Sequence, residues 1–173
     1  MERGITRKSY SIWWPTGEGF ADTPDLAIDT PGAGGSGYCV SLRYAGAAGA
    51  HASIGVDLGT NHAPWLLKGV VDMSEADSMS FMVKGSGGPV RVIFHSALSA
   101  AWYDWQYLLG LPDAGWTRVT IRFPGDLVPL FADGETRPWL EQAGAMQAIV
   151  FDRAGADSSG AQLVSVDDVY FYR

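Results

Sequence analysis

Cysteine, clustered positive charge and long apolar runs are all scarce in this sequence. Cys39 is the single cysteine among 173 residues, so the chain forms no internal disulfide and no thiolate metal cluster. The 12 Lys and Arg residues are outnumbered by 19 Asp and Glu, and a net charge of -7 without a basic run argues against nucleic acid as a partner. No apolar run approaches the roughly 20 residues that a membrane helix needs, so no membrane partner is expected.

Signals for export and for catalysis are also missing. The first eight residues are too polar for a signal peptide. The sequence has no Gly-x-Ser-x-Gly elbow, phosphate loop or His-Glu-x-x-His motif. A glycosidase needs two carboxyl groups at a defined separation, and no alternating pattern of acidic residues on one strand supplies them. We therefore expect a protein that is not an enzyme.

Glycine and proline, by contrast, are abundant. The 22 glycines and 9 prolines divide the chain into short segments, many of which alternate apolar with polar residues, as strands do. This pattern predicts an all-β fold, a β-sandwich jelly roll of two antiparallel sheets, with 1–173 as a single domain. A short helical turn is expected within 137–143. The predicted strands are 9–14, 38–44, 52–58, 78–84, 90–96, 103–109, 117–123, 147–152 and 163–172.

Alternation also assigns the faces of the predicted strands. Val90, Val92 and Phe94 share one face of their strand, which we expect to be in the core. Polar side chains on the outward faces are candidates to surround a sugar. These candidates are Arg91, His95, Arg122 and Asp152. The alternative is an ordinary solvated surface, whose ion pairs contribute little.

Four segments, in their order along the chain, resemble a known family. They are 36–44 (SGYCVSLRY), 71–85 (VDMSEADSMSFMVKG), 115–123 (GWTRVTIRF) and 164–171 (VSVDDVYF). The series is similar to the galactose-binding-like jelly rolls of carbohydrate-binding modules, and most similar to the family 11 type of bacterial cellulases and β-glucanases. The same frame resembles the intermediate-associated proteins of respiratory complex I, which are not lectins. The resemblance therefore implies the fold more firmly than the function.

The family resemblance implies a non-catalytic, monomeric module that binds β-glucan or a related hemicellulose of plant cell walls. It also implies that the module is appended to a polysaccharide-degrading enzyme and acts outside the cell as part of a secreted bacterial protein. Asp152 falls near a position that contacts ligand in such modules. The acidic segment with which the first strand of these modules commonly begins is missing from this sequence. Two alternatives stay open: a protein-interaction or assembly domain on the same frame, and a small glycoside hydrolase.

A neutral glycan is recognised by aromatic rings under the sugar and by polar groups around it. The strongest local candidate is the segment 101–107, in which Trp102 and Tyr103 are expected to project from a strand end. Trp105 and Tyr107 share one strand face and Asp104 lies on the other. We include all five as candidate ligand-binding residues, with core packing as the alternative for Trp105 and Tyr107.

Two further pairs are candidates. Trp13 and Trp14 are adjacent, so on a strand they point to opposite faces, one toward the core and one toward a ligand. Asp167 and Asp168 offer oxygen ligands for a structural calcium, although no contiguous calcium loop is present. Their alternative role is to accept hydrogen bonds from neighbouring loops. No cofactor is required by this interpretation.

Overall fold

The computed structural model describes residues 13–18, 25–35, 37–45, 51–58, 69–85, 89–99, 104–110, 115–131, 136–153 and 161–173. The bounds of the strands are β1 Trp13–Glu18, β2 Asp25–Asp29, β3 Cys39–Ala45, β4 His51–Asp57, β5 Ser78–Gly85, β6 Val90–Ser96, β7 Trp105–Leu109, β8 Thr117–Arg122, β9 Val128–Pro129, β10 Met146–Arg153 and β11 Ala161–Tyr172. Within these residues, one short α-helix, α1, covers Trp139–Ala143, and one 3-10 turn, η1, covers Ala33–Gly35.

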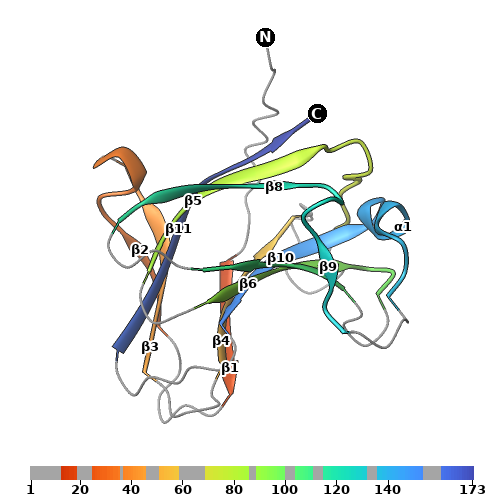
Figure 1. The fold of residues 1–173 in the computed structure, drawn as a ribbon. Coiled ribbons are helices and arrows are strands. Elements are labelled where there is room, and N and C mark those ends of the chain that lie inside the picture. The colour runs from red at the N-terminus through yellow and green to blue at the C-terminus, as the bar shows by residue number, and fades with distance from the viewer. Residues whose placement is uncertain are drawn as a thin grey trace.

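The strands form two sheets that face each other across the core (Figure 1). Sheet A has six strands in the order β1-β4-β10-β6-β7-β9, and sheet B has five in the order β2-β3-β11-β5-β8. The recorded strand pairs of both sheets are antiparallel. The predicted all-β sandwich of two antiparallel sheets is therefore confirmed.

The predicted strands differ from the observed ones mainly at the edges of the sheets. Residues 9–12 of the first predicted strand lie outside the described part of the chain, and β1 continues to Glu18. Strands β2 and β9 were not expected. Strand β2 is a five-residue edge strand with an acidic residue at each end, and β9 has only two residues, so neither carries a clear alternating pattern.

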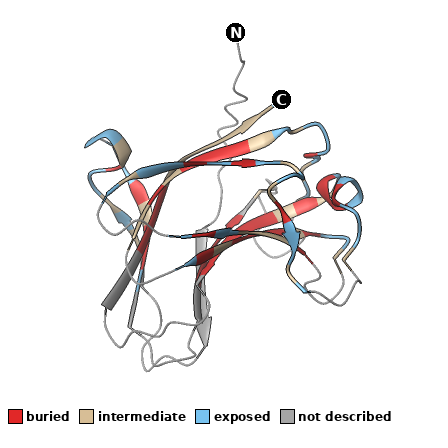
Figure 2. Cartoon of the chain, in the orientation of Figure 1, coloured by how far each residue is buried: buried red, intermediate tan, exposed pale blue. Residues whose placement is uncertain are grey.

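The core lies between the sheets, where buried residues concentrate (Figure 2). Phe81 of sheet B and Phe151 of sheet A meet edge to face, with ring centroids 5.2 Å apart. Val90, Val92 and Phe94 are fully buried in the same cluster, as their alternation predicts. Each sheet thus turns one apolar face toward the shared core.

Helix α1 covers one end of the sandwich. Trp139 is buried, and its ring lies 4.9 Å from that of Phe123 and 5.6 Å from that of Phe94. The helical turn predicted within 137–143 is confirmed. Among the residues that the structure describes, no helix is long and apolar enough to cross a membrane.

Candidate functional site on the outer face of sheet A

The register of sheet A brings polar residues of three adjacent strands together on its outer face. Asp152 of β10 pairs with Ser53 of β4 on one side and with Arg91 of β6 on the other. Further along β10, Val150 pairs with Ile93 and Ala148 with His95. Because directly paired residues of a sheet point to the same side, these side chains share the face opposite the core.

Asp152 links Ser53 and Arg91 into a charged network. Its Oδ1 accepts a 2.8 Å hydrogen bond from the Ser53 hydroxyl, and its Oδ2 accepts bonds from Arg91 Nε, at 2.9 Å, and from Nη2. The Asp152 side chain is 6% exposed and that of Arg91 is 34% exposed. The carboxylate is therefore a buried anchor, and the guanidinium is the group of the three that reaches the surface.

Asp104 holds His95 in a similar way at the other end of β6. His95 Nδ1 lies 2.8 Å from Asp104 Oδ2, and the Asp104 side chain is fully buried. The second oxygen, Oδ1, accepts a 3.3 Å bond from the backbone N–H of Ser96. A carboxylate at Nδ1 fixes the orientation of the imidazole ring on this face.

Apolar side chains lie between and beside these two polar groups. Ile93 and Val150 are 7% and 5% exposed, although they are on the outer side of the sheet. At the β7–β9 edge, Leu108 and Val128 are 63% and 52% exposed and pair with Arg91 and Gln106, respectively. This face thus offers an exposed apolar edge next to the guanidinium of Arg91.

The two buried carboxylates belong to two separate polar groups on this face. Asp152 lies beside Arg91 and Asp104 beside His95, and these two partners are four residues apart in β6. Each carboxylate here already has a cation or imidazole as partner, which suits a positioning role.

The structure corrects several predicted site residues. Arg122 belongs to β8 of sheet B, where it pairs with Asp126, so it cannot lie beside Arg91 and His95 on sheet A. Trp105 and Tyr107 face the core side of β7 and pack against the buried cluster, because β7 presents alternate residues to the core. The Trp105 indole N–H is also bound to the Arg137 carbonyl at 2.9 Å.

The other predicted site residues either lie on the strand face that was predicted for them or fall outside the residues that the structure describes. Asp104 and Asp152 are where the alternation puts them, but both are buried and support a neighbour. Trp102 and Tyr103 lie outside the described residues. In β1, Trp13 pairs with Val56, a core residue, and Trp14 pairs with Gly55. The side chains of both tryptophans lie outside the description.

Asp167 and Asp168 of β11 are both engaged in hydrogen bonds. Asp167 accepts bonds from the backbone N–H of Ala33 and of Asp168, both at 2.8 Å, and Asp168 accepts one from the Tyr170 hydroxyl at 3.2 Å. Over the described ranges, no group of three or more His, Cys, Asp or Glu residues is arranged to hold a metal ion. The bonds to the η1 turn match the alternative proposed for these residues from the sequence.

Sequence reasoning missed Ser53, Leu108 and Val128 as residues of this face. Ser53 alternates with Ile54 in a predicted strand, so its outward direction was available from the pattern. Its partner Asp152 is far away in the chain, and only the strand order brings the two together.

Comparison with solved structures shows what the fold is similar to. No protein-family model and no curated protein matches the sequence. The family 11 carbohydrate-binding module of the cellulosomal cellulase Lic26A-Cel5E of Clostridium thermocellum matches with a TM-score of 0.65 and 18% identity, over 99% of this chain and 94% of that one. A family 11 module from the same organism in complex with a β-1,3-1,4-mixed-linked tetrasaccharide gives 0.64 and 19%, over 98% and 94%.

The frame also occurs inside larger proteins. The enzymatically active domain of tailspike protein 4 of bacteriophage CBA120 matches with a TM-score of 0.53 and 13% identity, over 92% of this chain and 19% of that one. At these identities the likeness shows the fold, which is that of a family 11-like carbohydrate-binding module. The resemblance noted in the sequence is confirmed at that level.

Proposed function

We propose that this chain is a non-catalytic carbohydrate-binding module that holds β-glucan or a related plant cell-wall polysaccharide on the outer face of sheet A. The observation that carries the proposal is the Ser53–Asp152–Arg91 network on that face. It places a guanidinium at the surface on a buried carboxylate anchor. Such an anchor holds a hydrogen-bonding group in place before the ligand arrives, which lowers the entropic cost of binding.

The chemistry of the face suits a neutral sugar chain. Arg91 has N–H donors beyond those directed at Asp152, and a planar guanidinium can bind neighbouring hydroxyl groups. The exposed Leu108 and Val128 can cover the C–H surface of a sugar ring. One of Trp13 and Trp14, together with Trp102 and Tyr103, stays a predicted stacking partner.

Further properties belong to the same proposal. A β-1,3-1,4-linked tetrasaccharide is bound by the similar family 11 module, which makes a β-linked glucan the first ligand to test. The net charge of -7 favours a neutral polymer over an anionic one. We include in the proposal that the module is monomeric and serves a secreted polysaccharide-degrading enzyme.

The proposal is tested by native affinity electrophoresis through gels that contain mixed-linkage β-glucan, xyloglucan, hydroxyethylcellulose, xylan or mannan, with calorimetry on each hit. We expect retardation in one or two gels without release of reducing ends. A folded chain that no gel retards would contradict the proposal and favour a protein partner. Release of reducing ends would contradict the non-catalytic part.

A matched pair of variants locates the site. Arg91→Lys keeps a cation for Asp152 but loses the planar fork, so binding should fall by about tenfold or more while the fold is kept. Arg137→Ala removes an exposed arginine beside α1 and should bind as the parent does. Equal binding by the parent and Arg91→Lys would remove Arg91 from the site.

A further inference from the structure

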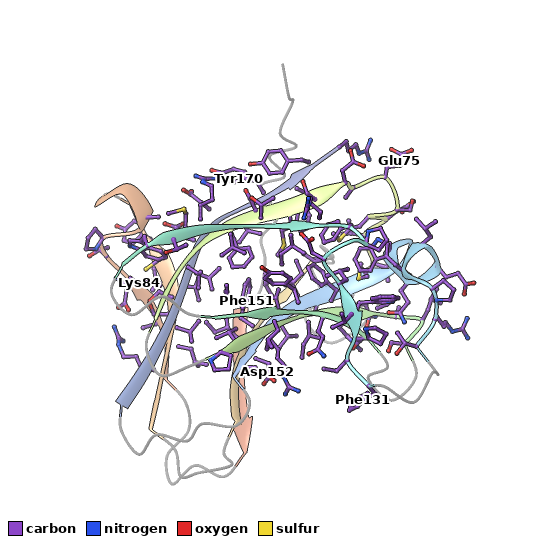
Figure 3. The ribbon with its side chains drawn as sticks, in the orientation of Figure 1. Glu75, Lys84, Phe131, Phe151, Asp152 and Tyr170 are labelled. Atoms are coloured by element: carbon purple, nitrogen blue, oxygen red, sulfur yellow. The ribbon has the colours of Figure 1, made fainter. Side chains whose placement is uncertain are left out.

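The outer face of sheet B carries ordered aromatic side chains that the proposed site on sheet A does not use. Tyr170 and Tyr172 of β11 pair with Ser80 and Ser78 of β5, whereas Phe171 between them pairs with the core residue Met79. The two tyrosines therefore point away from the core on neighbouring outward positions. In Figure 3, Tyr170 is on the outer side of sheet B, while Phe151 lies between the sheets.

Both tyrosine rings are partly exposed and anchored through their hydroxyl groups. The Tyr170 hydroxyl donates to Asp168 Oδ1 at 3.2 Å, and the Tyr172 hydroxyl lies 3.1 Å from Oγ of the buried Ser80. A ring held at both its Cβ and its hydroxyl loses little freedom when a ligand covers it. These rings are thus suited to stacking without reorganisation.

A bulge in β11 creates this arrangement. Asp167 pairs with Met82 and Tyr170 with Ser80, so two residues of β11, Asp168 and Val169, stand opposite one residue of β5. Asp168 has a positive φ of 49°, which turns its carboxylate toward Tyr170. Bulges characteristically redirect a side chain at a functional position.

A third ring extends the aromatic surface across the sheet. Trp116 precedes β8 and is partly exposed, with Lys84 Nζ 5.0 Å from its ring centroid. Lys84 and Ser78 are at opposite ends of β5, so the rings of Trp116, Tyr170 and Tyr172 extend over about 20 Å along the strand direction. Arg118, exposed on the intervening outer surface of β8, adds hydrogen-bond donors.

We propose that Tyr170, Tyr172 and Trp116 form a second binding surface on sheet B, which takes a neutral polysaccharide chain lying flat on the sheet. An aromatic platform with adjacent Arg and Asp side chains matches the apolar ring faces and peripheral hydroxyl groups of such a chain. The positive charges of Lys84 and Arg118 are matched by the negative charges of Asp167 and Asp168, so the surface has no excess that would select a polyanion. Two faces on opposite sides of one domain can contact two chains of an insoluble material at once, which raises avidity.

This inference rests on the proposed function for the class of ligand, but it concerns different residues. The test measures adsorption to regenerated amorphous cellulose and microcrystalline cellulose in parallel with binding to soluble mixed-linkage β-glucan. Tyr170→Ala/Tyr172→Ala should weaken adsorption to the insoluble material by about tenfold or more, the factor that one good stacking contact provides. Binding of the soluble glucan through sheet A should be unchanged.

A matched control separates the rings from their hydroxyl groups. Tyr170→Phe/Tyr172→Phe keeps both rings but removes their hydroxyl anchors, so it should adsorb somewhat less well than the parent and clearly better than the double alanine variant. The inference is overturned if the double alanine variant adsorbs like the parent, or if the phenylalanine variant loses as much as the alanine variant. If the double alanine variant does not fold, Tyr170→Ala and Tyr172→Ala are measured singly against the same criterion. If Arg91→Lys does not weaken binding of the soluble glucan, that result contradicts the proposed site on sheet A and leaves the proposed surface on sheet B unaffected.

Discussion

At the scale of single residues, burial decides how much stability is lost when one partner of the Arg91–Asp152 ion pair is removed. Arg91→Ala leaves the carboxylate of Asp152, only 6% exposed, with Ser53 as its remaining partner, and should destabilise the protein by about 3 kcal/mol. Asp152→Ala leaves a guanidinium that is 34% exposed and can reach water, so its cost should be smaller, about 1–2 kcal/mol. Urea unfolding of each variant measures the difference.

The double variant Arg91→Ala/Asp152→Ala is the control for this asymmetry. It removes both charges at once and leaves no unpaired carboxylate in the sheet, so it should be more stable than Arg91→Ala alone. If the two single costs simply add, then the buried carboxylate is not the source of the penalty.

Tyr170 provides a residue-scale prediction about pH. The negative charge of Asp168, together with its hydrogen bond, raises the pKa of the Tyr170 hydroxyl above its ordinary value of 10.0. Asp168→Asn should therefore lower this pKa, as an ultraviolet titration of phenolate absorbance would show, with Tyr170→Phe identifying the signal. Because the folded pKa is raised, the stabilisation is complete below about pH 10 and is lost as the pH rises through the folded pKa. An unchanged titration in Asp168→Asn would rule out Asp168 as the cause.

At the scale of elements, the bulge of β11 depends on one unusual backbone conformation. Asp168 has a φ of 49°, a region that glycine enters freely and alanine does not. Asp168→Gly and Asp168→Ala both delete the carboxylate and differ by one methyl group. The alanine variant should be the less stable by about 1 kcal/mol in thermal or urea unfolding, the reverse of the order in a regular strand. Equal stability would mean that the bulge rearranges.

The same elements show how far the sequence determines the fold. Alternation correctly gave the faces of β6 and β8, because each strand has one side in the core. It could not tell which sheet a strand joins, since strand order depends on contacts between segments far apart in the chain. Arg91 and Arg122 were both correctly placed outward, yet they lie on opposite sheets. The hydrogen bond between Ser53 and Asp152 could not be predicted from the sequence for the same reason.

Aromatic residues show the corresponding limit for the site. The cluster at 101–107 looked like a ligand platform, but Trp105 and Tyr107 also satisfy the requirement of a strand for large apolar residues on its core side. Composition alone does not separate these roles. Tyr170 and Tyr172 carry the same pattern around a core residue, and only the register with β5 shows that they point outward.

At the scale of the whole molecule, both proposed surfaces depend on a shared core. Phe81 of sheet B and Phe151 of sheet A stack edge to face at 5.2 Å, and both are at most 1% exposed. Phe81→Ala should therefore cost about 3–5 kcal/mol. In a domain of this size, each kcal/mol lowers Tm by roughly 2–4 °C. The more conservative Phe81→Leu keeps most of the volume and should cost clearly less.

If the two sheets unfold as one unit, heating should abolish binding at both proposed surfaces over the same temperature range. Calorimetry and tryptophan fluorescence should give one coincident transition for the parent and for Phe81→Ala, at a lower temperature in the variant. Binding to soluble glucan and adsorption to cellulose should then disappear over the same temperature range. Separate transitions, or adsorption that survives the loss of soluble binding, would show that the two sheets do not share a single cooperative core.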